Sequence, residues 1–302
     1  MVSGRVLVLG ATGYIGTQLV TVLLERGYLV RAAGRSLAKL ERCSWAKNNR
    51  VEIVETNALD KQGLQNACRG CEVVYYLVHS MNPQNKDFIQ TDRRAAQDMI
   101  GVAGKTGVRR IIYLGGLGEN DKTLSKHLRS RMEVSRILHS GKVPVTTLRA
   151  AMIIGKGSVS FEILRCLVNR LPIIITPCWI FTQSQPIAVT NVIHYLVGCL
   201  ESEHTAGQVF DIGGPDVLSY RELMDIYAKE AGLRKRLIIP VPFLTVTLSS
   251  LWGGWITPFP AYIVRPLVEG LKNRVVCQDN RIRDIIPQKL LNCHEAIRMA
   301  IS

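Results

Sequence analysis

Three glycines near the start of the chain have the spacing of a diphosphate-binding turn. Gly10, Gly13 and Gly16 follow the apolar run 6–9 and open onto an amphipathic stretch, residues 17–26. In a strand–turn–helix unit the first glycine permits a tight turn, the second lets the backbone approach the phosphates, and the third allows close helix–strand packing. The helix N-terminus then favours an anion. These residues predict a dinucleotide site; the alternative interpretation is a glycine turn used only for packing.

Basic and hydroxyl side chains follow the second predicted strand. A carboxylate at this place would accept hydrogen bonds from the adenosine ribose and repel a 2′-phosphate. The chain has Arg35, Ser36 and Lys39 instead, and the next acid along the sequence is Glu41. The planar guanidinium of Arg35 suits a phosphate, and Ser36 adds a hydroxyl. This pattern predicts a preference for NADP(H) over NAD(H). The alternative is that Arg35 is a surface residue, or stacks on adenine without selecting the phosphate.

The elements that would position these residues alternate between strand-like and helix-like segments up to residue 150, and the pattern loosens afterwards. Apolar strands that alternate with helices imply a parallel sheet covered on both faces. We therefore predict an α/β fold: a doubly wound parallel sheet (Rossmann) over residues 1–150, then a smaller α+β substrate lobe over residues 151–302. The expected strands are 5–9, 29–34, 51–55, 73–78, 110–114 and 145–149; the expected helices lie near 17–26, 61–68, 86–106, 124–140, 158–170 and 190–200, and another begins with a capping box at Ser219–Glu222.

Charge and cysteine usage limit the classes of partner. The chain has 38 Lys and Arg against 24 Asp and Glu, a net charge of +14, which favours an anionic partner such as a nucleotide or an acidic membrane surface. It has no arginine-rich tract, zinc-ligand spacing or stacked aromatic motif, so neither nucleic acid nor a metal is expected. The eight cysteines are scattered, which indicates reduced thiols and a cytoplasmic location. The pair Cys68–Cys71 sits at a helix end and is expected to be structural.

Two features bear on attachment to membranes. The first strand begins at residue 5, so no signal or transit peptide is expected. Residues 237–264 carry no charge and are flanked by basic residues, but prolines leave only 243–257 as an uninterrupted helix. This amphipathic helix is too short to cross a bilayer, which needs about 20 apolar residues. Three interpretations stay open: packing on the lobe or on a second subunit in a homodimer, peripheral membrane contact or a lid over an apolar substrate, and a true span.

Several motifs together resemble a known superfamily. They are residues 10–16, Arg35, 75–81, 111–118, 127–131, 213–215 and 219–223. In these residues the chain resembles the atypical, extended-like short-chain dehydrogenases/reductases, in their NmrA-like and complex-I-accessory-subunit-like branch. The likeness runs from residue 4 to about residue 287. The glycine motif is general to the superfamily, whereas block 127–131 and the proline-rich segment are similar to a prokaryotic subgroup of NAD(P)-binding proteins.

The resemblance implies a set of cofactor contacts. The pyrophosphate would lie at the glycine turn, the ribose phosphate at the end of the second strand, the adenine beside the third strand, and the nicotinamide ribose after the fourth. In that order the implied residues are Gly10, Thr12, Gly13, Tyr14, Ile15 and Gly16; Arg35 and Ser36; Asn57 and Ala58; and Leu77, Val78 and His79.

The catalytic residues of the superfamily are replaced in this chain. Active members use a Ser or Thr after the fifth strand and a Tyr-x-x-x-Lys pair on the next helix, whose Tyr donates the proton. Here glycines occupy 115–116, and His127 and Arg131 stand at the Tyr and Lys positions, on one helix face. An imidazole can exchange protons near its ordinary pKa of about 6.5, whereas a guanidinium stays charged and can bind ribose hydroxyls or a phosphate. His79 and Tyr113 are further candidates, with structural roles favoured.

Two functions remain open. The first is an NADP(H)-dependent reductase of an apolar carbonyl or quinone-like small molecule, with His127 as the acid. The second is a non-catalytic NADP(H)-binding redox sensor or assembly protein, in which His127 and Arg131 are merely polar residues on a half-exposed helix.

Overall fold

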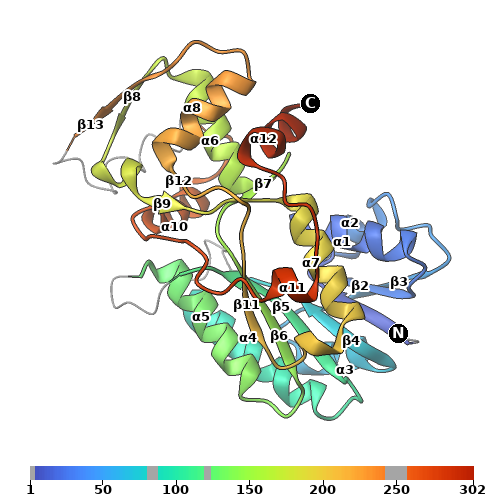
Figure 1. Ribbon diagram of the computed structural model, residues 1–302. Helices are drawn as coiled ribbons and strands as arrows, with labels where there is room; N and C mark the ends of the chain where they lie inside the picture. Colours follow the sequence, from blue (N-terminus) through green and yellow to red (C-terminus); the bar gives the residue numbers. More distant parts are fainter. Residues whose placement is uncertain (1–3, 80–87, 119–123, 242–256) are drawn as a thin grey trace.

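A seven-stranded parallel sheet forms the larger part of the molecule (Figure 1). The computed structural model describes residues 4–79, 88–118, 124–241 and 257–302. The strand order is β11-β6-β5-β4-β1-β2-β3, so the order reverses between β1 and β4, as in a doubly wound fold. The predicted fold class is therefore confirmed. The strands are β1 (Arg5–Leu9), β2 (Val30–Gly34), β3 (Val51–Glu55), β4 (Cys71–Tyr76), β5 (Arg110–Gly116), β6 (Val145–Ala150) and β11 (Val209–Ile212).

Alternating side chains of the strands bury both faces of this sheet. In β1, Val6 and Val8 pack in a core with α1 and α7, whereas Leu7 and Leu9 pack in a second core with α3, α4 and α5. Because both faces are covered, strand β1 reads as one continuous apolar run rather than an alternating one. The helices around the sheet are α1 (Tyr14–Glu25), α2 (Leu37–Glu41), α3 (Lys61–Cys68), α4 (Phe88–Ala103), α5 (Lys126–His139) and α7 (Val189–Glu201).

A smaller lobe lies beyond the carboxyl ends of the strands and has its own core. Side chains of α6, α8 and α12 meet there around Phe161, Leu223 and Ile297. Its strands form two-stranded ladders, β7 with β10, β8 with β13, and β9 with β12. The bounds are β7 (Ile153–Ile154), β8 (Ile173–Thr176), β9 (Gln183–Ser184), β10 (Ile187–Ala188), β12 (Leu218–Ser219), β13 (Leu237–Pro240), α6 (Val159–Arg170), α8 (Tyr220–Glu230), α10 (Ala261–Gly270), α11 (Ile282–Ile285), α12 (Cys293–Ile301) and the 3-10 turns η1 (Cys178–Phe181) and η2 (Glu203–Thr205).

The chain does not keep to the lobe after residue 150. It returns to the sheet, where α7 packs against α1 and β11 pairs with β6, before it re-enters the lobe. Residues of the range 151–302, expected to form only the lobe, thus complete one edge and one face of the large sheet. The capping box at Ser219 and Glu222 is present, and a second one, Asn292 with Glu295, starts α12.

The uncharged segment is described only in part. Residues 243–256 of the helix expected over 243–257 lie outside the described residues. Across the parts of the chain that the structure describes, no helix has the length and apolar character needed to traverse a bilayer.

The Cys68–Cys71 pair is structural. Both thiols are free and buried, and burial raises the pKa of Cys68 to about 12 and also raises the pKa of Cys71. The guanidinium of Arg31 contacts the Cys71 sulfur at 3.5 Å and donates to the carbonyl of Ala67 at 2.8 Å. Protonated, enclosed thiols are poor nucleophiles and poor metal ligands. The described residues hold no cluster of metal-ligating side chains.

Candidate functional site

The glycine turn has the geometry of an anion cradle. Gly10 has a φ of +97°, a left-handed conformation that favours glycine. A Cβ on Gly16 would lie 2.2 Å from the Gly10 carbonyl oxygen, so only glycine lets α1 approach the turn this closely. Helix α1 begins at Tyr14 without a side-chain cap, and N–H groups in a first helical turn have no partner within the helix. The turn therefore fits a pyrophosphate.

This close packing gives a direct test on stability. We expect Gly16→Ala to lower the free energy of unfolding by about 1–3 kcal/mol, because the added methyl must displace backbone atoms. Urea unfolding followed by circular dichroism measures the change. Gly101→Ala is the matched control, since a Cβ at that position in α4 meets nothing within 4 Å. A Gly16→Ala protein that unfolds at the wild-type urea concentration would contradict the packing described.

The end of β2 presents an exposed cation. Arg35 is exposed and makes no hydrogen bond or ion pair with any described residue. The Ser36 hydroxyl oxygen accepts the Lys39 N–H at 3.4 Å as the N-cap of α2, which leaves the hydroxyl hydrogen free to donate. Sequence reasoning missed one neighbour: the Glu55 carboxylate accepts the Leu37 N–H at 3.1 Å. The pairing of β2 with β3, which places Glu55 opposite Gly34, brings this acid to the site.

The residues predicted to contact the adenine follow β3, and those predicted to contact the nicotinamide ribose follow β4. Asn57 is exposed, with its side-chain oxygen accepting the Leu59 N–H at 3.1 Å, while Ala58 is buried. Strand β4 ends at Tyr76, and Leu77 continues beside the glycine turn: its N–H donates to the Leu9 carbonyl, and its carbonyl oxygen would be 3.0 Å from a Cβ on Gly10. These contacts lie between β1 and β4, where ligands bind in such sheets.

The segment after β4 carries the predicted contacts Leu77, Val78 and His79. Leu77 and Val78 are half-buried. The His79 side chain contacts solvent, but many neighbouring protein atoms reduce its hydration. The resulting loss of hydration, followed by the positive charge of Arg131 and smaller effects of His127 and Arg35, lowers the pKa of His79 well below its usual range.

Helix α5 presents His127 and Arg131 to adjoining spaces. Ser125 caps the helix by accepting the Leu128 N–H, and both candidate side chains are half-buried. His127 lines an apolar pocket, whereas Arg131 lines a neighbouring groove between α5 and β6; Gly116 borders both. Burial, followed by the positive charge of Arg131, lowers the pKa of His127 to about 3. At neutral pH the imidazole is therefore uncharged and carries one N–H donor.

Tyr113 packs inside the protein between β5 and α5. Its hydroxyl donates to the Arg131 carbonyl oxygen at 3.3 Å, and its ring tilts against Tyr76 at a centroid distance of 6.0 Å. Burial raises the pKa of the Tyr113 phenol, so this residue stays protonated and joins β5 to α5 rather than facing the cleft.

The cavity that His127 borders has a volume of about 380 Å³ and is enclosed mainly by apolar side chains. The carboxyl ends of β5 and β6 form its floor, and α6, β8 and α10 of the lobe form its walls. Leu164, Ile174, Trp179, Met224, Val264 and Leu267 are among its lining residues. Parallel sheets bind ligands at this edge, and apolar walls of this kind suit a molecule with few polar atoms.

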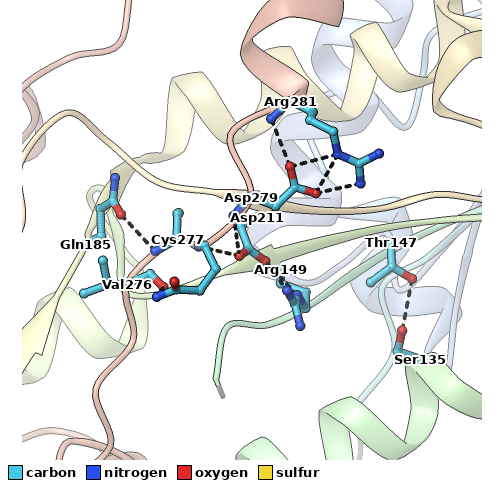
Figure 2. Close-up of polar contacts among 10 residues, drawn as sticks. Ser135, Thr147, Arg149, Gln185, Asp211, Val276, Cys277, Asp279 and Arg281 are labelled. Atoms are coloured by element: carbon cyan, nitrogen blue, oxygen red, sulfur yellow. Dashed lines mark hydrogen bonds and ion pairs between the residues drawn. The ribbon is translucent and has the colours of Figure 1, made fainter. Parts of the chain in front are cut away.

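A buried ion pair joins β11 to β6 and holds the segment that follows the cavity-lining residue Val275; Figure 2 shows the pair. Asp211 on β11 is fully buried and pairs with Arg149 on β6 at 2.6 Å. Its second carboxylate oxygen accepts the N–H groups of Gln278 and Asp279 at 2.9 and 3.3 Å. These bonds hold residues 276–281 against the sheet, directly after Val275, which lines the cavity.

The fold and this cleft define the class: a doubly wound dinucleotide-binding protein with a small lobe over the carboxyl edge of its sheet. Within that class the chain belongs to the NmrA-like family, which matches residues 2–164. The resemblance drawn from the motifs is thereby confirmed.

Two curated relatives match parts of the chain. Cinnamoyl-CoA reductase 1 of Petunia hybrida is 30% identical over 126 residues, which cover 39% of this chain and 37% of that protein. The mitochondrial NADH dehydrogenase [ubiquinone] 1 alpha subcomplex subunit 9 of Arabidopsis thaliana is 25% identical over 227 residues, which cover 72% of this chain and 56% of that protein. The chain thus spans little more than a third of the first relative and about half of the second.

A solved structure shares the fold over nearly the whole chain. The NADPH-dependent quinone oxidoreductase of Escherichia coli, in complex with NADPH, superimposes with a TM-score of 0.77 at 14% sequence identity. The superposition covers 98% of this chain and 100% of that one, so both the sheet and the small lobe correspond.

Proposed function

We propose that this protein is an NADP(H)-dependent reductase of an apolar carbonyl or quinone-like small molecule. The observation that carries the proposal is the apolar cavity of about 380 Å³ that meets His127 at the carboxyl edge of the sheet. Apolar walls next to a dinucleotide cleft would limit the access of water to the reacting atoms. The names of the cinnamoyl-CoA reductase relative and the quinone oxidoreductase neighbour agree with this class of reaction.

The chain's own residues would bind the cofactor and polarise the substrate. The reduced nicotinamide, when bound, supplies a hydride, which is one proton and two electrons. The N–H groups at the start of α1 would hold its pyrophosphate, and Arg35 its ribose phosphate. The uncharged His127 would donate a hydrogen bond to the substrate oxygen as negative charge develops there, in the manner of a neutral electrophilic histidine. Water then supplies the proton that completes the alcohol or hydroquinone.

Cofactor preference follows from the cation at the end of β2. We expect Arg35→Ala to weaken NADPH binding by about 10- to 100-fold and to leave NADH binding unchanged, because a charge-assisted hydrogen bond contributes about 1.5–3 kcal/mol. Fluorescence titration with both cofactors measures the ratio. Arg42→Ala removes an equal charge from an exposed position at the end of α2 and serves as the control.

The neighbouring carboxylate sharpens this test. The Glu55 carboxylate accepts the Leu37 N–H, and its negative charge would repel the ribose phosphate of a bound NADPH. Glu55→Gln should therefore strengthen NADPH binding and leave NADH binding largely unaffected. An unchanged NADPH-to-NADH ratio in Arg35→Ala would refute the assignment of Arg35 to the phosphate.

The proposed reaction is tested with the purified protein in two steps. The protein is titrated with NADPH, NADP⁺ and NADH, and oxidation of bound NADPH is then followed by stopped flow against a panel of quinones and aldehydes. Tight NADPH binding with turnover on an apolar acceptor is the expected result. Tight binding without turnover on any acceptor would reject the reductase.

A second candidate function is a non-catalytic NADP(H)-binding sensor or assembly protein. It is favoured by the glycines at 115–116, which provide no hydroxyl near His127, and by the name of the complex I subunit relative. A sensor should bind the oxidised and reduced cofactors with unequal affinity, and its His127→Ala variant should behave like the wild type.

A further inference from the structure

The ladder of β8 and β13 exposes a row of aliphatic side chains. Parallel pairing places Leu237 beside Ile173 and Ile239 beside Ile175, and these side chains are 56%, 52%, 41% and 58% exposed, respectively. The intervening Ile174 and Ile238 point the other way and are buried in the lobe core. Figure 1 shows this ladder at the outer edge of the lobe, away from the large sheet. We call the four exposed side chains the isoleucine face.

Basic residues flank the isoleucine face, and acids are missing from the segments that build it. Arg170 and Pro172 lead into β8, and Arg234 and Lys235 lead into β13; all four residues are exposed. The sequence has no Asp or Glu between Glu162 and Glu201, nor between Glu230 and Glu269. An apolar surface flanked by cations complements an anionic surface that is itself apolar underneath.

The isoleucine face continues into the interior. Ile173 and Ile175 are more than half exposed, and both also line the cavity that His127 borders. The cavity wall and the outer surface therefore share side chains at this ladder. A molecule dissolved in an apolar phase outside the lobe would reach the cavity along apolar side chains.

We propose that the isoleucine face docks on an anionic lipid bilayer, with Arg234 and Lys235 at the headgroups. A second copy of the chain fits less well, because a two-fold interface would bring the same basic flanks together. The docking needs no catalysis. The added consequence, that an apolar acceptor enters the cavity from the bilayer, rests on the proposed reductase function.

Vesicle sedimentation of the full chain, without cofactor or acceptor, tests the docking separately from the reaction. The vesicles are equal mixtures of phosphatidylcholine and phosphatidylglycerol, compared with pure phosphatidylcholine. Arg234→Gln with Lys235→Gln should weaken binding about fivefold per charge at low salt. Ile173→Thr with Ile175→Thr should weaken binding at least about tenfold, since threonine keeps the β-branched shape and removes apolar surface.

The controls change matched positions elsewhere. Val217→Thr alters an aliphatic side chain that is 41% exposed, and Lys105→Gln with Lys142→Gln removes two exposed charges; both should bind vesicles like the wild type. Thermal unfolding checks that each variant is folded.

Three results would overturn the proposal. One is wild-type protein that stays in the supernatant with anionic vesicles. Another is binding that depends on charge but is equal in the isoleucine and control variants, which would indicate general attraction of a basic protein. The third is light scattering that shows the isoleucine variants dissociating a dimer while their vesicle binding is unchanged.

Discussion

His127→Ala should lower kcat about 100-fold with an acceptor that the wild-type protein reduces, while NADPH binding stays the same. The expected loss is that of one hydrogen-bond donor to a developing oxyanion, about 10²–10³ in rate. His127→Gln keeps a neutral N–H donor and should retain part of this activity. Steady-state kinetics with saturating NADPH measures both variants.

The control for this prediction lies on the same helix. His139 bonds to Thr147 at 3.0 Å, outside the cavity, so His139→Ala should leave kcat unchanged. Because the pKa of His127 is lowered to about 3, its uncharged form persists from acidic to neutral pH, and kcat should show no histidine titration between about pH 5 and pH 8. A wild-type rate that falls through a pKa near 6.5, with the step absent in His127→Ala, would show imidazolium acid catalysis instead.

Asp211→Ala should lower the free energy of unfolding by about 3 kcal/mol. Removing one member of a buried ion pair costs about 3–5 kcal/mol, and we take the lower end because the Arg149 side chain is 30% exposed and can be hydrated. The N–H groups of Gln278 and Asp279 also lose their acceptor. Urea unfolding measures the change, and proteolysis within residues 276–281 should accelerate.

A neighbouring carboxylate provides the matched control. Asp279 makes a two-pronged ion pair with Arg281 at 2.7 Å, but the Arg281 side chain is 61% exposed (Figure 2). Exposed pairs contribute about 0–1 kcal/mol, so Asp279→Ala should be nearly silent. Equal losses in the Asp211 and Asp279 variants would mean that burial does not determine the strength of these pairs.

Local patterns in the sequence were sufficient for six of the seven strands of the sheet, β1 to β6. Strand-like runs predicted β1 to β6 to within two residues at each end, and β1 is clearest because a strand covered on both faces has no polar alternation to obscure it. The Ser219–Glu222 capping box marked the start of α8 for a similar reason: its bonds join residues only three positions apart. Strand β4, predicted over 73–78, ends earlier at Tyr76 because Leu77 turns to meet the glycine loop.

Features that depend on distant residues could not be read from the sequence. Glu55 reaches the end of β2 only through strand pairing, and nothing near Arg35 in the sequence announces it. The return of β11 to the sheet was hidden for the same reason, since Val209–Ile212 is a short strand within a polar stretch. The altered pKa of His127 arises from the lobe and helix that enclose it, whereas the sequence alone suggests an ordinary value.

The path of the chain between the two units has a practical consequence. A cut after residue 150 would remove α7 and β11 together with the lobe. The core against α1 would lose Tyr195, Leu196 and Phe210, so the side chains that they cover would be exposed, and β6 would become an open edge. The lobe therefore cannot be exchanged as a cassette between relatives. New substrate specificity must come from substitutions in the cavity wall, or from swaps that carry α7 and β11 along with their own sheet.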